Sequence, residues 1–388
     1  MEFFQLVLVL LSASSVKSVL VPSTTHTAAE FYAGIGGMRC ALNMARPEWK
    51  VSASYEINTQ ANAVYEHNWG KHNSFCRSIE TLQANELDSM NRADLWLLSP
   101  PCQPYTKIGK RLDDKDNRAK SFLYLLDILS HLQSPPEFLF LENVPGFLGS
   151  RSRARMLETL ATAQYETFET LLSPQRGFGL GIPNTRLRYF CLAQKKNPGK
   201  RTGKLFAGKD PSLVLMARGD LPAEGTTRLR PLSEFLLRKE DLDTATESLV
   251  QGPLAVSPEL MRRFSYVKFD VAHPLATETS TVTKGYTKQI GKSGPLLCVK
   301  SWRKSLEEKP TFIGKKLDCP PSLERFRHLD PSNDEVRFLS PRELLRLHGF
   351  PEEFDFPSHI TPRQASALIG NSVTVPLLAR LLDLLLPK

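Results

Sequence analysis

The chain has 388 residues and a formal net charge of +9, with 41% hydrophobic and 23% charged residues. These ordinary fractions are typical of a folded globular protein, and the length suffices for one large domain and a smaller one. The mildly basic balance allows a polyanionic partner. None of the six cysteines forms a Cys-x-x-Cys pair, so the sequence argues against a zinc site and a disulfide framework.

The N-terminus carries an apolar run over residues 3–11 that resembles the core of a signal peptide. The residues before it include Glu2 and no lysine or arginine, so the usual positive start is missing. The run is too short to cross a bilayer as a helix, and no other stretch has a membrane-spanning pattern. We expect residues 1–26 to be an extension outside the fold, with a secretion signal as the alternative.

From residue 27 onward, strand patterns alternate with helix patterns. Strands are predicted at 28–32, 51–55, 75–80, 94–98, 137–141, 165–172 and 187–193. Helices are predicted at 38–45, 59–68, 120–132 and 153–163. This alternation indicates a Rossmann-like α/β domain with a doubly wound, mostly parallel sheet over residues 27–193.

After residue 193 the pattern becomes irregular, with short elements and many prolines, which predicts a smaller second domain over 194–361. A helix begins after Ser340, which can cap it, with Pro341 in the first turn. Further helices are predicted at 363–369 and 376–386. Residues 362–388 form a C-terminal segment.

The first strand leads into a glycine turn at Gly34, Gly36 and Gly37, and Glu56 ends the second strand. An acid at that position can bind the ribose hydroxyls of an adenosine-containing cofactor. Because the turn reads G-x-G-G and not G-x-G-x-x-G, a cofactor without phosphates, such as S-adenosylmethionine, fits better than a dinucleotide. A plain structural turn is the alternative.

A single cysteine follows the apolar strand at 94–98. Cys102 stands between Pro101 and Pro104, and prolines restrict the backbone around them. We therefore interpret Cys102 as a nucleophile that is held in place, the alternative being a buried, inert cysteine.

Two further motifs also border predicted strands. Glu142 directly follows the strand predicted at 137–141, and the carboxyl ends of parallel strands line the ligand crevice. Arg186 and Arg188 are alternate residues at the start of the next strand pattern, so we expect both guanidinium groups to point into one cleft. The alternatives are a salt-bridged Glu142 and a pair of surface arginines.

Together these groups suggest methylation of cytosine at carbon 5. A thiolate that adds to carbon 6 makes carbon 5 nucleophilic, and a glutamic acid can protonate nitrogen 3. The target base must leave its stack to reach such a site.

The chain resembles the cytosine-carbon-5 methyltransferases in five ordered motifs that run from about residue 28 to the C-terminus. These motifs are 31–37 (Phe-Tyr-Ala-Gly-Ile-Gly-Gly), 99–104 (Ser-Pro-Pro-Cys-Gln-Pro), 142–144 (Glu-Asn-Val), 186–188 (Arg-Leu-Arg) and 370–373 (Gly-Asn-Ser-Val). The resemblance implies catalytic roles for Cys102, Glu142, Arg186 and Arg188. It implies S-adenosylmethionine contacts from Phe31, Gly34, Ile35, Gly36, Gly37, Glu56, Ile57, Ile79, Ser99, Pro101, Asn371, Ser372 and Val373. It also implies that the C-terminal segment packs beside the glycine turn.

The stretches 104–110, 180–190 and 283–286 resemble one subgroup, the small eukaryotic DNA methyltransferase homologue two proteins, which methylate the anticodon loop of aspartate tRNA. This chain has Thr281-Val282-Thr283 where the subgroup has Cys-Phe-Thr. The resemblance implies nucleic-acid contacts in a target-recognition domain over 194–361, and residues 103–120 are interpreted as a lid over the flipped base. The nucleic-acid-binding residues expected are Lys107, Lys110, Arg111, Lys284 and Tyr286.

The leading prediction is therefore a monomeric tRNA cytosine-5 methyltransferase without a membrane partner. The expected location is the cytoplasm, and the nucleus stays open as a second location. A DNA cytosine-5 methyltransferase shares the chemistry and stays open, as does a catalytically silent nucleic-acid-binding protein. A nicotinamide dehydrogenase is disfavoured because the phosphate-binding G-x-G-x-x-G is missing.

Overall fold

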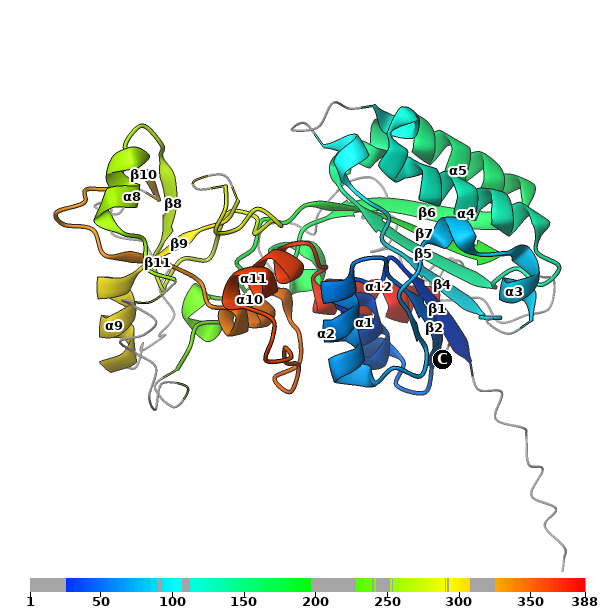
Figure 1. Cartoon of the computed structure of the whole chain (residues 1–388), viewed down its shortest axis with the longest axis horizontal. Helices are drawn as coiled ribbons and strands as arrows, with labels where there is room; N and C mark the ends of the chain where they lie inside the picture. The colour runs from blue at the N-terminus through cyan, green and yellow to red at the C-terminus, as the bar shows by residue number, and fades with distance from the viewer. Residues whose placement is uncertain are drawn as a thin grey trace, which may run out of the picture.

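The computed structural model describes residues 26–89, 92–106, 112–196, 228–238, 241, 252, 254–289, 291, 293–307 and 325–387. All but the last residue of the extension expected at 1–26 lies outside the described residues. The described residues form a large α/β lobe and a smaller lobe, with two helices between them (Figure 1).

The large lobe is built on a seven-stranded sheet with the order β3-β2-β1-β4-β5-β7-β6. Strands β1 to β5 are parallel, and β7 is antiparallel to both of its neighbours. This confirms the predicted mostly parallel sheet. The strands are β1 (Thr27–Phe31), β2 (Lys50–Tyr55), β3 (Ser74–Phe75), β4 (Leu95–Leu98), β5 (Phe138–Asn143), β6 (Tyr165–Leu172) and β7 (Arg188–Lys195).

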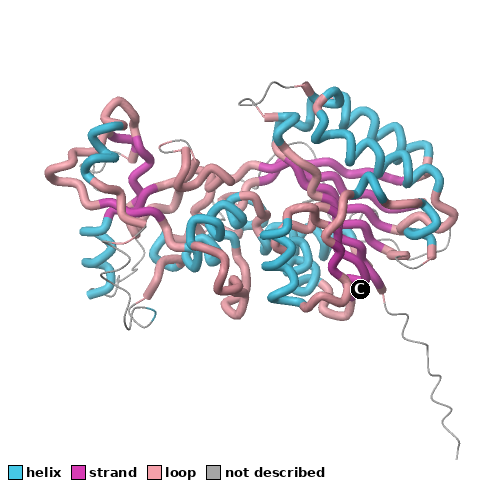
Figure 2. Tube along the Cα trace, in the orientation of Figure 1, coloured by secondary structure: helices cyan, strands magenta, loops and turns pink. Residues whose placement is uncertain are grey.

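Helices cover both faces of this sheet (Figures 1 and 2). On one face lie α1 (Gly37–Ala45), α2 (Thr59–Trp69) and α12 (Val375–Leu385). On the other lie α3 (Ala84–Asp88), α4 (Lys120–His131) and α5 (Arg151–Thr162). Alternate residues of β4 enter the two cores, because side chains alternate along a strand: Leu95 and Leu97 pack on one side, and Trp96 and Leu98 on the other.

The smaller lobe contains a four-stranded sheet with the order β10-β8-β9-β11. Its elements are α8 (Pro258–Arg263), β8 (Phe269–Ala272), β9 (Leu296–Cys298), α9 (Val299–Glu307), β10 (Phe326–Arg327) and β11 (Val336–Phe338). Between the two lobes lie α10 (Pro341–His348) and α11 (Pro362–Gly370), which pack on one another (Figure 1).

Short 3-10 helices shape the connections. Two of them, η1 (Ile79–Thr81) and η2 (Gln103–Tyr105), follow strands of the large sheet. The others are η3 (Asp113–Lys115), η4 (Asn117–Ala119), η5 (Pro145–Gly149), η6 (Gly177–Gly179) and η7 (Leu232–Glu234). The strand predicted at 75–80 is wrong in its length, because β3 ends at Phe75. The Ser78 side chain accepts a hydrogen bond from the Glu80 N–H, which favours a turn over a longer strand.

The C-terminal segment returns to the large lobe, where α12 packs on α1. The buried Arg46 guanidinium holds its end, donating to the backbone carbonyls of Asp383, Leu386 and Pro387. Residues Pro362–Leu385 have the length and hydropathy of a membrane span, but 67% of their most apolar window is buried, as in the core of a globular fold. They form two separate helices, α11 and α12.

The start of α10 is fixed by a buried charge pair. Ser340 caps this helix and Pro341 lies in its first turn, as predicted, and Glu343 completes a capping box with Ser340. Arg337, fully buried, donates to Glu343 Oε1 over 2.7 Å and to Oε2 over 2.8 Å, and stacks over the Trp302 ring. This pair joins the smaller lobe to α10.

Arg337→Met should lower the free energy of unfolding by about 3–5 kcal/mol, because it leaves the Glu343 carboxylate buried without its cation. The matched control is Arg155→Met, since Arg155 pairs with Asp127 on the surface and should cost below about 1 kcal/mol. Urea unfolding curves of both variants measure the difference. Equal losses would contradict the role of the buried pair.

Candidate active site

The carboxyl ends of β4 and β5 bring Cys102 and Glu142 together. The two strands are parallel neighbours, with Leu98 opposite Leu141. Glu142 is the next residue in β5, and Cys102 follows β4 by four positions. Their electrostatic interaction contributes to the pKa of the Cys102 thiol. The two groups that the sequence places at strand ends therefore share one site.

The loop that carries Cys102 is held from several sides. The Ser99 hydroxyl donates to the Tyr32 carbonyl over 2.9 Å, and the Asn143 side chain donates to the Pro100 carbonyl over 3.2 Å. At Gly146 an added Cβ would lie 2.1 Å from the Tyr105 carbonyl oxygen. Only glycine allows the loop after β5 to approach the cysteine loop this closely.

Arg188 contacts Glu142 directly, with 3.2 Å between Nε and Oε1. Burial raises the pKa of Glu142, while Arg188 and Arg186 oppose this shift. Burial also raises the pKa of the Cys102 thiol, Glu142 raises it further, and the two arginines lower it. Burial thus shifts both groups toward their protonated forms, and the two arginines shift them back.

Arg186 corrects one sequence prediction. Because β7 begins at Arg188, Arg186 precedes the strand and the two arginines do not share a strand face. The Arg186 guanidinium is buried and donates to the carbonyls of Val282 over 2.8 Å, Gly370 over 3.3 Å and Ser372. It ties the smaller lobe and the C-terminal segment to the site, where its charge acts on both Cys102 and Glu142.

The glycine turn is organised by Glu56 and by close packing. Glu56 Oε2 accepts the Gly34 N–H over 2.8 Å. Gly36 has φ of +83°, and its Cβ would lie 2.2 Å from the Trp69 ring. A Cβ at Gly37 would lie 2.7 Å from both the Ser372 hydroxyl and Val373. The C-terminal motif therefore packs beside the turn, as the resemblance implies.

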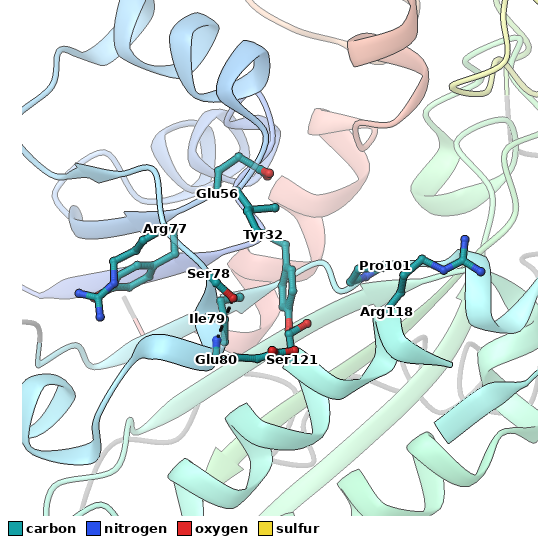
Figure 3. Close-up of a pocket in the computed structure, with 11 residues that line it drawn as sticks. Tyr32, Glu56, Arg77, Ser78, Ile79, Glu80, Pro101, Arg118 and Ser121 are labelled. Atoms are coloured by element: carbon teal, nitrogen blue, oxygen red, sulfur yellow. Dashed lines mark hydrogen bonds between the residues drawn. The ribbon is translucent and has the colours of Figure 1, made fainter. Parts of the chain in front are cut away.

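A cavity of about 300 Å³ opens next to this turn (Figure 3). Its walls include Glu56, Ile57, Ile79 and Pro101, which are four of the predicted cofactor residues. Ile57 is 70% exposed, so its apolar side chain is available to a ligand. It lies next to Glu56, whose carboxylate can accept hydrogen bonds from hydroxyl groups. A ligand with a ribose and a flat apolar ring fits these groups.

The other predicted cofactor residues lie outside the cavity wall. Phe31 and Ile35 are buried, Gly34, Gly36 and Gly37 form the turn, and Ser99 holds the cysteine loop. Sequence reasoning missed seven wall residues: Tyr32, Tyr55, Arg77, Ser78, Glu80, Arg118 and Ser121. Arg77, Ser78 and Glu80 follow the carboxyl end of β3, so the rule that selected Glu56 could have found them.

The predicted nucleic-acid contacts divide into three groups. Lys107, Lys110 and Arg111 lie outside the described residues. Lys284 is exposed. Tyr286 is a correction: it is 1% exposed, and its hydroxyl donates to the Pro295 carbonyl and accepts the Leu339 N–H, so it supports the core of the smaller lobe.

The described part of the predicted lid is anchored. Asp113 accepts the backbone N–H groups of Arg151 and Ser152 at the start of α5, and Asp114 pairs with the Arg151 side chain. Residues 107–111 of the predicted lid lie outside the described part of the chain. The segment from 112 to 119 is thus fixed to α5 by acidic side chains.

The sequence matches the family described as "C-5 cytosine-specific DNA methylase" over residues 26–386. A Dictyostelium discoideum protein named "DNA (cytosine-5)-methyltransferase" is 34% identical, covering 92% of this chain and 93% of the relative. A Spodoptera frugiperda "tRNA (cytosine(38)-C(5))-methyltransferase" is 32% identical, covering 93% of this chain and 99% of the relative.

Solved structures agree with this match. The Schizosaccharomyces pombe Dnmt2 methyltransferase has a TM-score of 0.68 at 26% identity, covering 92% of this chain and 97% of the other. The Entamoeba histolytica methyltransferase EhMeth has a TM-score of 0.69 at 25% identity, with the same coverage. The predicted family resemblance and fold are confirmed, and the chain belongs to the C-5 cytosine methyltransferase family.

Proposed function

We propose that the protein transfers a methyl group from S-adenosylmethionine to carbon 5 of a cytosine in tRNA. The observation that supports this most directly is the placement of Cys102 beside a buried Glu142 at the ends of two parallel strands. Relatives from five animals and fission yeast that are named tRNA (cytosine(38)-C(5))-methyltransferases, at 29–32% identity, support the choice of tRNA.

S-adenosylmethionine, when bound, supplies an electrophilic methyl group on a sulfonium sulfur. Glu56 would accept hydrogen bonds from the ribose hydroxyls of this cofactor. The apolar side chains of Ile57, Ile79 and Pro101 would surround its adenine. Glu56 already accepts the N–H groups of Gly34 and Asn58, which hold its carboxylate in place for that contact.

Cys102 would act as the nucleophile. The Cys102 thiol would lose its proton to solvent before the thiolate adds to carbon 6 of the cytosine. Protonated Glu142 would give its proton to nitrogen 3, so that the ring does not build up negative charge. The resulting electron-rich carbon 5 would form the new bond to the methyl carbon while the bond between that carbon and the sulfonium sulfur breaks, which leaves a neutral thioether. Solvent then takes the proton from carbon 5, the 5,6 double bond re-forms and expels the Cys102 thiolate, and Glu142 recovers its proton from nitrogen 3.

The two arginines would support this chemistry differently. Arg188 lies against Glu142 and can stabilise the carboxylate that remains after the proton has moved to the base. Arg186, bound to three backbone carbonyls, would act as a positioning residue for the surrounding segments.

For the substrate we propose the anticodon loop of aspartate tRNA, read by the residues over 194–361, with Lys284 as a phosphate contact. DNA is the second candidate, since the Dictyostelium relative at 34% identity is named a DNA (cytosine-5)-methyltransferase. Both substrates require the target cytosine to leave its stack.

Cys102→Ala should reduce methyl transfer by about 10⁴-fold or more, because no other group replaces the nucleophile. Binding of S-adenosylmethionine should stay nearly unchanged. Labelled-methyl transfer and calorimetric titration measure the two effects, with Cys76→Ala, which removes an exposed cysteine, as the control. Undiminished transfer by the Cys102 variant would refute the nucleophile assignment.

Glu142→Gln should change two properties in opposite directions. Methyl transfer should fall by about 100-fold, because glutamine cannot give a proton to nitrogen 3. In alkaline buffer, alkylation of Cys102 by iodoacetamide should become faster, because the ionised carboxylate that raises the pKa of the thiol is gone. Peptide mass spectrometry follows Cys102, and Cys76 in the same sample is the internal control. An unchanged alkylation rate would show that the two groups do not interact.

Total tRNA and genomic DNA are offered separately to the protein with labelled cofactor. We expect the labelled methyl group to appear in tRNA, at a cytosine of the anticodon loop. Binding to tRNA should weaken steeply between 50 and 200 mM salt, since each phosphate contact releases counterions (about 10³-fold or more for six contacts). Base mapping identifies the methylated nucleotide. Label in DNA alone would replace the tRNA proposal by its rival.

A further inference from the structure

The smaller lobe exposes an aromatic side chain that the proposed mechanism does not use. Tyr266 lies in the loop between α8 and β8 (Figure 1) and is 76% exposed, more than any other large hydrophobic side chain that the structure describes. A single exposed hydrophobic residue needs no explanation by itself. The backbone and the charges around Tyr266 distinguish it from such a residue.

The backbone on both sides of Tyr266 is fixed by hydrogen bonds. The Val267 N–H donates to the Phe264 carbonyl over 2.9 Å, and the Ser265 carbonyl accepts from His328 Nδ1 over 2.8 Å. The centroids of the Phe264 and Tyr266 rings lie 6.2 Å apart. The loop therefore holds the tyrosine in a defined place, so a ligand that stacks on the ring has to order only two side-chain torsions.

The charges near this ring are positive. Arg262 and Arg263 are exposed in the last turn of α8, and the Arg263 guanidinium lies over the Phe264 ring at 5.7 Å. Residues 260–269 contain no aspartate or glutamate. An exposed aromatic ring beside guanidinium groups is typical of surfaces that bind unpaired nucleotides, because the ring stacks on a base and the cations attract the flanking phosphates.

A second basic segment packs beside the Tyr266 loop. At Gly291 an added Cβ would lie 2.3 Å from Cγ1 of Val267, the residue that follows Tyr266. Shortly before Gly291 the chain carries Lys284 and Lys288, which are both exposed. The two segments therefore bring arginines and lysines to one region of the smaller lobe.

This region continues toward the active site. At Gly370 an added Cβ would lie 2.2 Å from the Thr283 carbonyl oxygen and 2.9 Å from the Lys284 nitrogen. Gly370 directly precedes the C-terminal motif at 371–373, which packs beside the glycine turn. The contacts thus lead from the glycine turn to the Tyr266 loop through a stretch, residues 279–295, that contains no acid.

We propose that Tyr266 is a stacking platform for an unpaired base of the RNA substrate, other than the cytosine that is methylated. Four exposed cations would hold the phosphates on either side of this base: Arg262, Arg263, Lys284 and Lys288. The inference rests on the proposed function, since it assumes an RNA substrate. A single-stranded loop suits the platform better than a duplex, because only an unpaired base can turn its face to the ring. The contact acts on binding and not on the chemical step, because the reacting groups lie in the large lobe.

The test measures binding and methyl transfer by the full chain, with three probes: total tRNA, a short single-stranded RNA, and the same RNA paired with its complement. Tyr266→Ala should raise the Kd and the KM for tRNA about tenfold and change kcat less than about twofold, because a stacked base is lost while the chemistry is kept. Affinity for the single-stranded RNA should fall similarly, and affinity for the duplex should not. Tyr266→Phe should restore tRNA binding to within about twofold, because it keeps the ring.

Phe326→Ala is the matched control. Phe326 is also an exposed aromatic residue of the smaller lobe, at 46%, and the Arg325 guanidinium lies over its ring at 4.8 Å. Here, however, the arginine is paired with Asp270 over 2.6 Å and with Glu278 over 3.3 Å. Because this cation is already neutralised, removal of the Phe326 ring should leave the affinity for tRNA unchanged.

Arg263→Gln tests the charged part of the surface. A plot of log Kd against log salt concentration should become less steep by about 0.7, the value for one phosphate contact on a single strand. Tyr266→Ala should weaken binding at every salt concentration without a change of this slope, because stacking on a neutral ring releases no counterions.

The outcomes are distinct. Unchanged tRNA binding and KM in Tyr266→Ala would overturn the inference and leave the proposed methyl transfer intact. A loss that Tyr266→Phe does not restore, or an equal loss in Phe326→Ala, would also overturn it, since stacking on Tyr266 predicts neither. Tyr266-dependent binding to vesicles of phosphatidylserine and phosphatidylcholine, with tRNA binding unchanged, would assign the loop to a membrane surface instead. If the unaltered protein methylates no RNA, the proposed function fails, and the binding measurements with single-stranded and paired RNA still decide on the platform.

Discussion

The arrangement of the site depends on the hydrogen bonds that the buried Arg186 guanidinium donates to backbone carbonyls. Its bonds to the carbonyls of Val282, Gly370 and Ser372 join a loop of the smaller lobe to the C-terminal segment. Ser372 in turn packs against Gly37, where a side chain would not fit. One buried cation thus connects the glycine turn to the lobe that is proposed to read the nucleic acid. A planar group with several donors is needed here, because it must donate to three carbonyls from separate segments.

Burial controls the chemistry of the cysteine and the glutamate. It raises the pKa values of both Cys102 and Glu142, and the carboxylate raises that of the thiol further. Burial therefore favours the protonated form of Glu142, which can give a proton, and disfavours the thiolate form of Cys102. Arg188 acts against both shifts. The proposed reaction uses this state, since the proton on Glu142 is needed at the moment when the thiolate adds to the base.

Two acids flank the glycine turn in different environments. Glu56 lies at the cavity wall, where hydrogen bonds from Gly34 and Asn58 hold its carboxylate. Glu30 lies beneath the turn and takes a free N–H of α1. In a dinucleotide-binding fold that helix end would face a pyrophosphate. Here an internal carboxylate occupies part of it, which agrees with the absence of the G-x-G-x-x-G pattern from the sequence.

The sequence by itself determined the alternation of strands and helices, the glycine turn, the family, and the strand ends that carry Glu56, Cys102 and Glu142, because periodicity and turn chemistry are local properties of the chain. Only the tertiary structure decided the environment of side chains. It buried Tyr286 and turned Arg186 toward backbone carbonyls, although both residues have polar groups that suit a ligand. It also placed Glu30 under the turn. It brought the carbonyls of Val282 and Ser372, which lie 96 and 186 residues from Arg186 in the sequence, to the guanidinium of that arginine. Local patterns carry no information on such contacts, because they arise only when distant segments pack together.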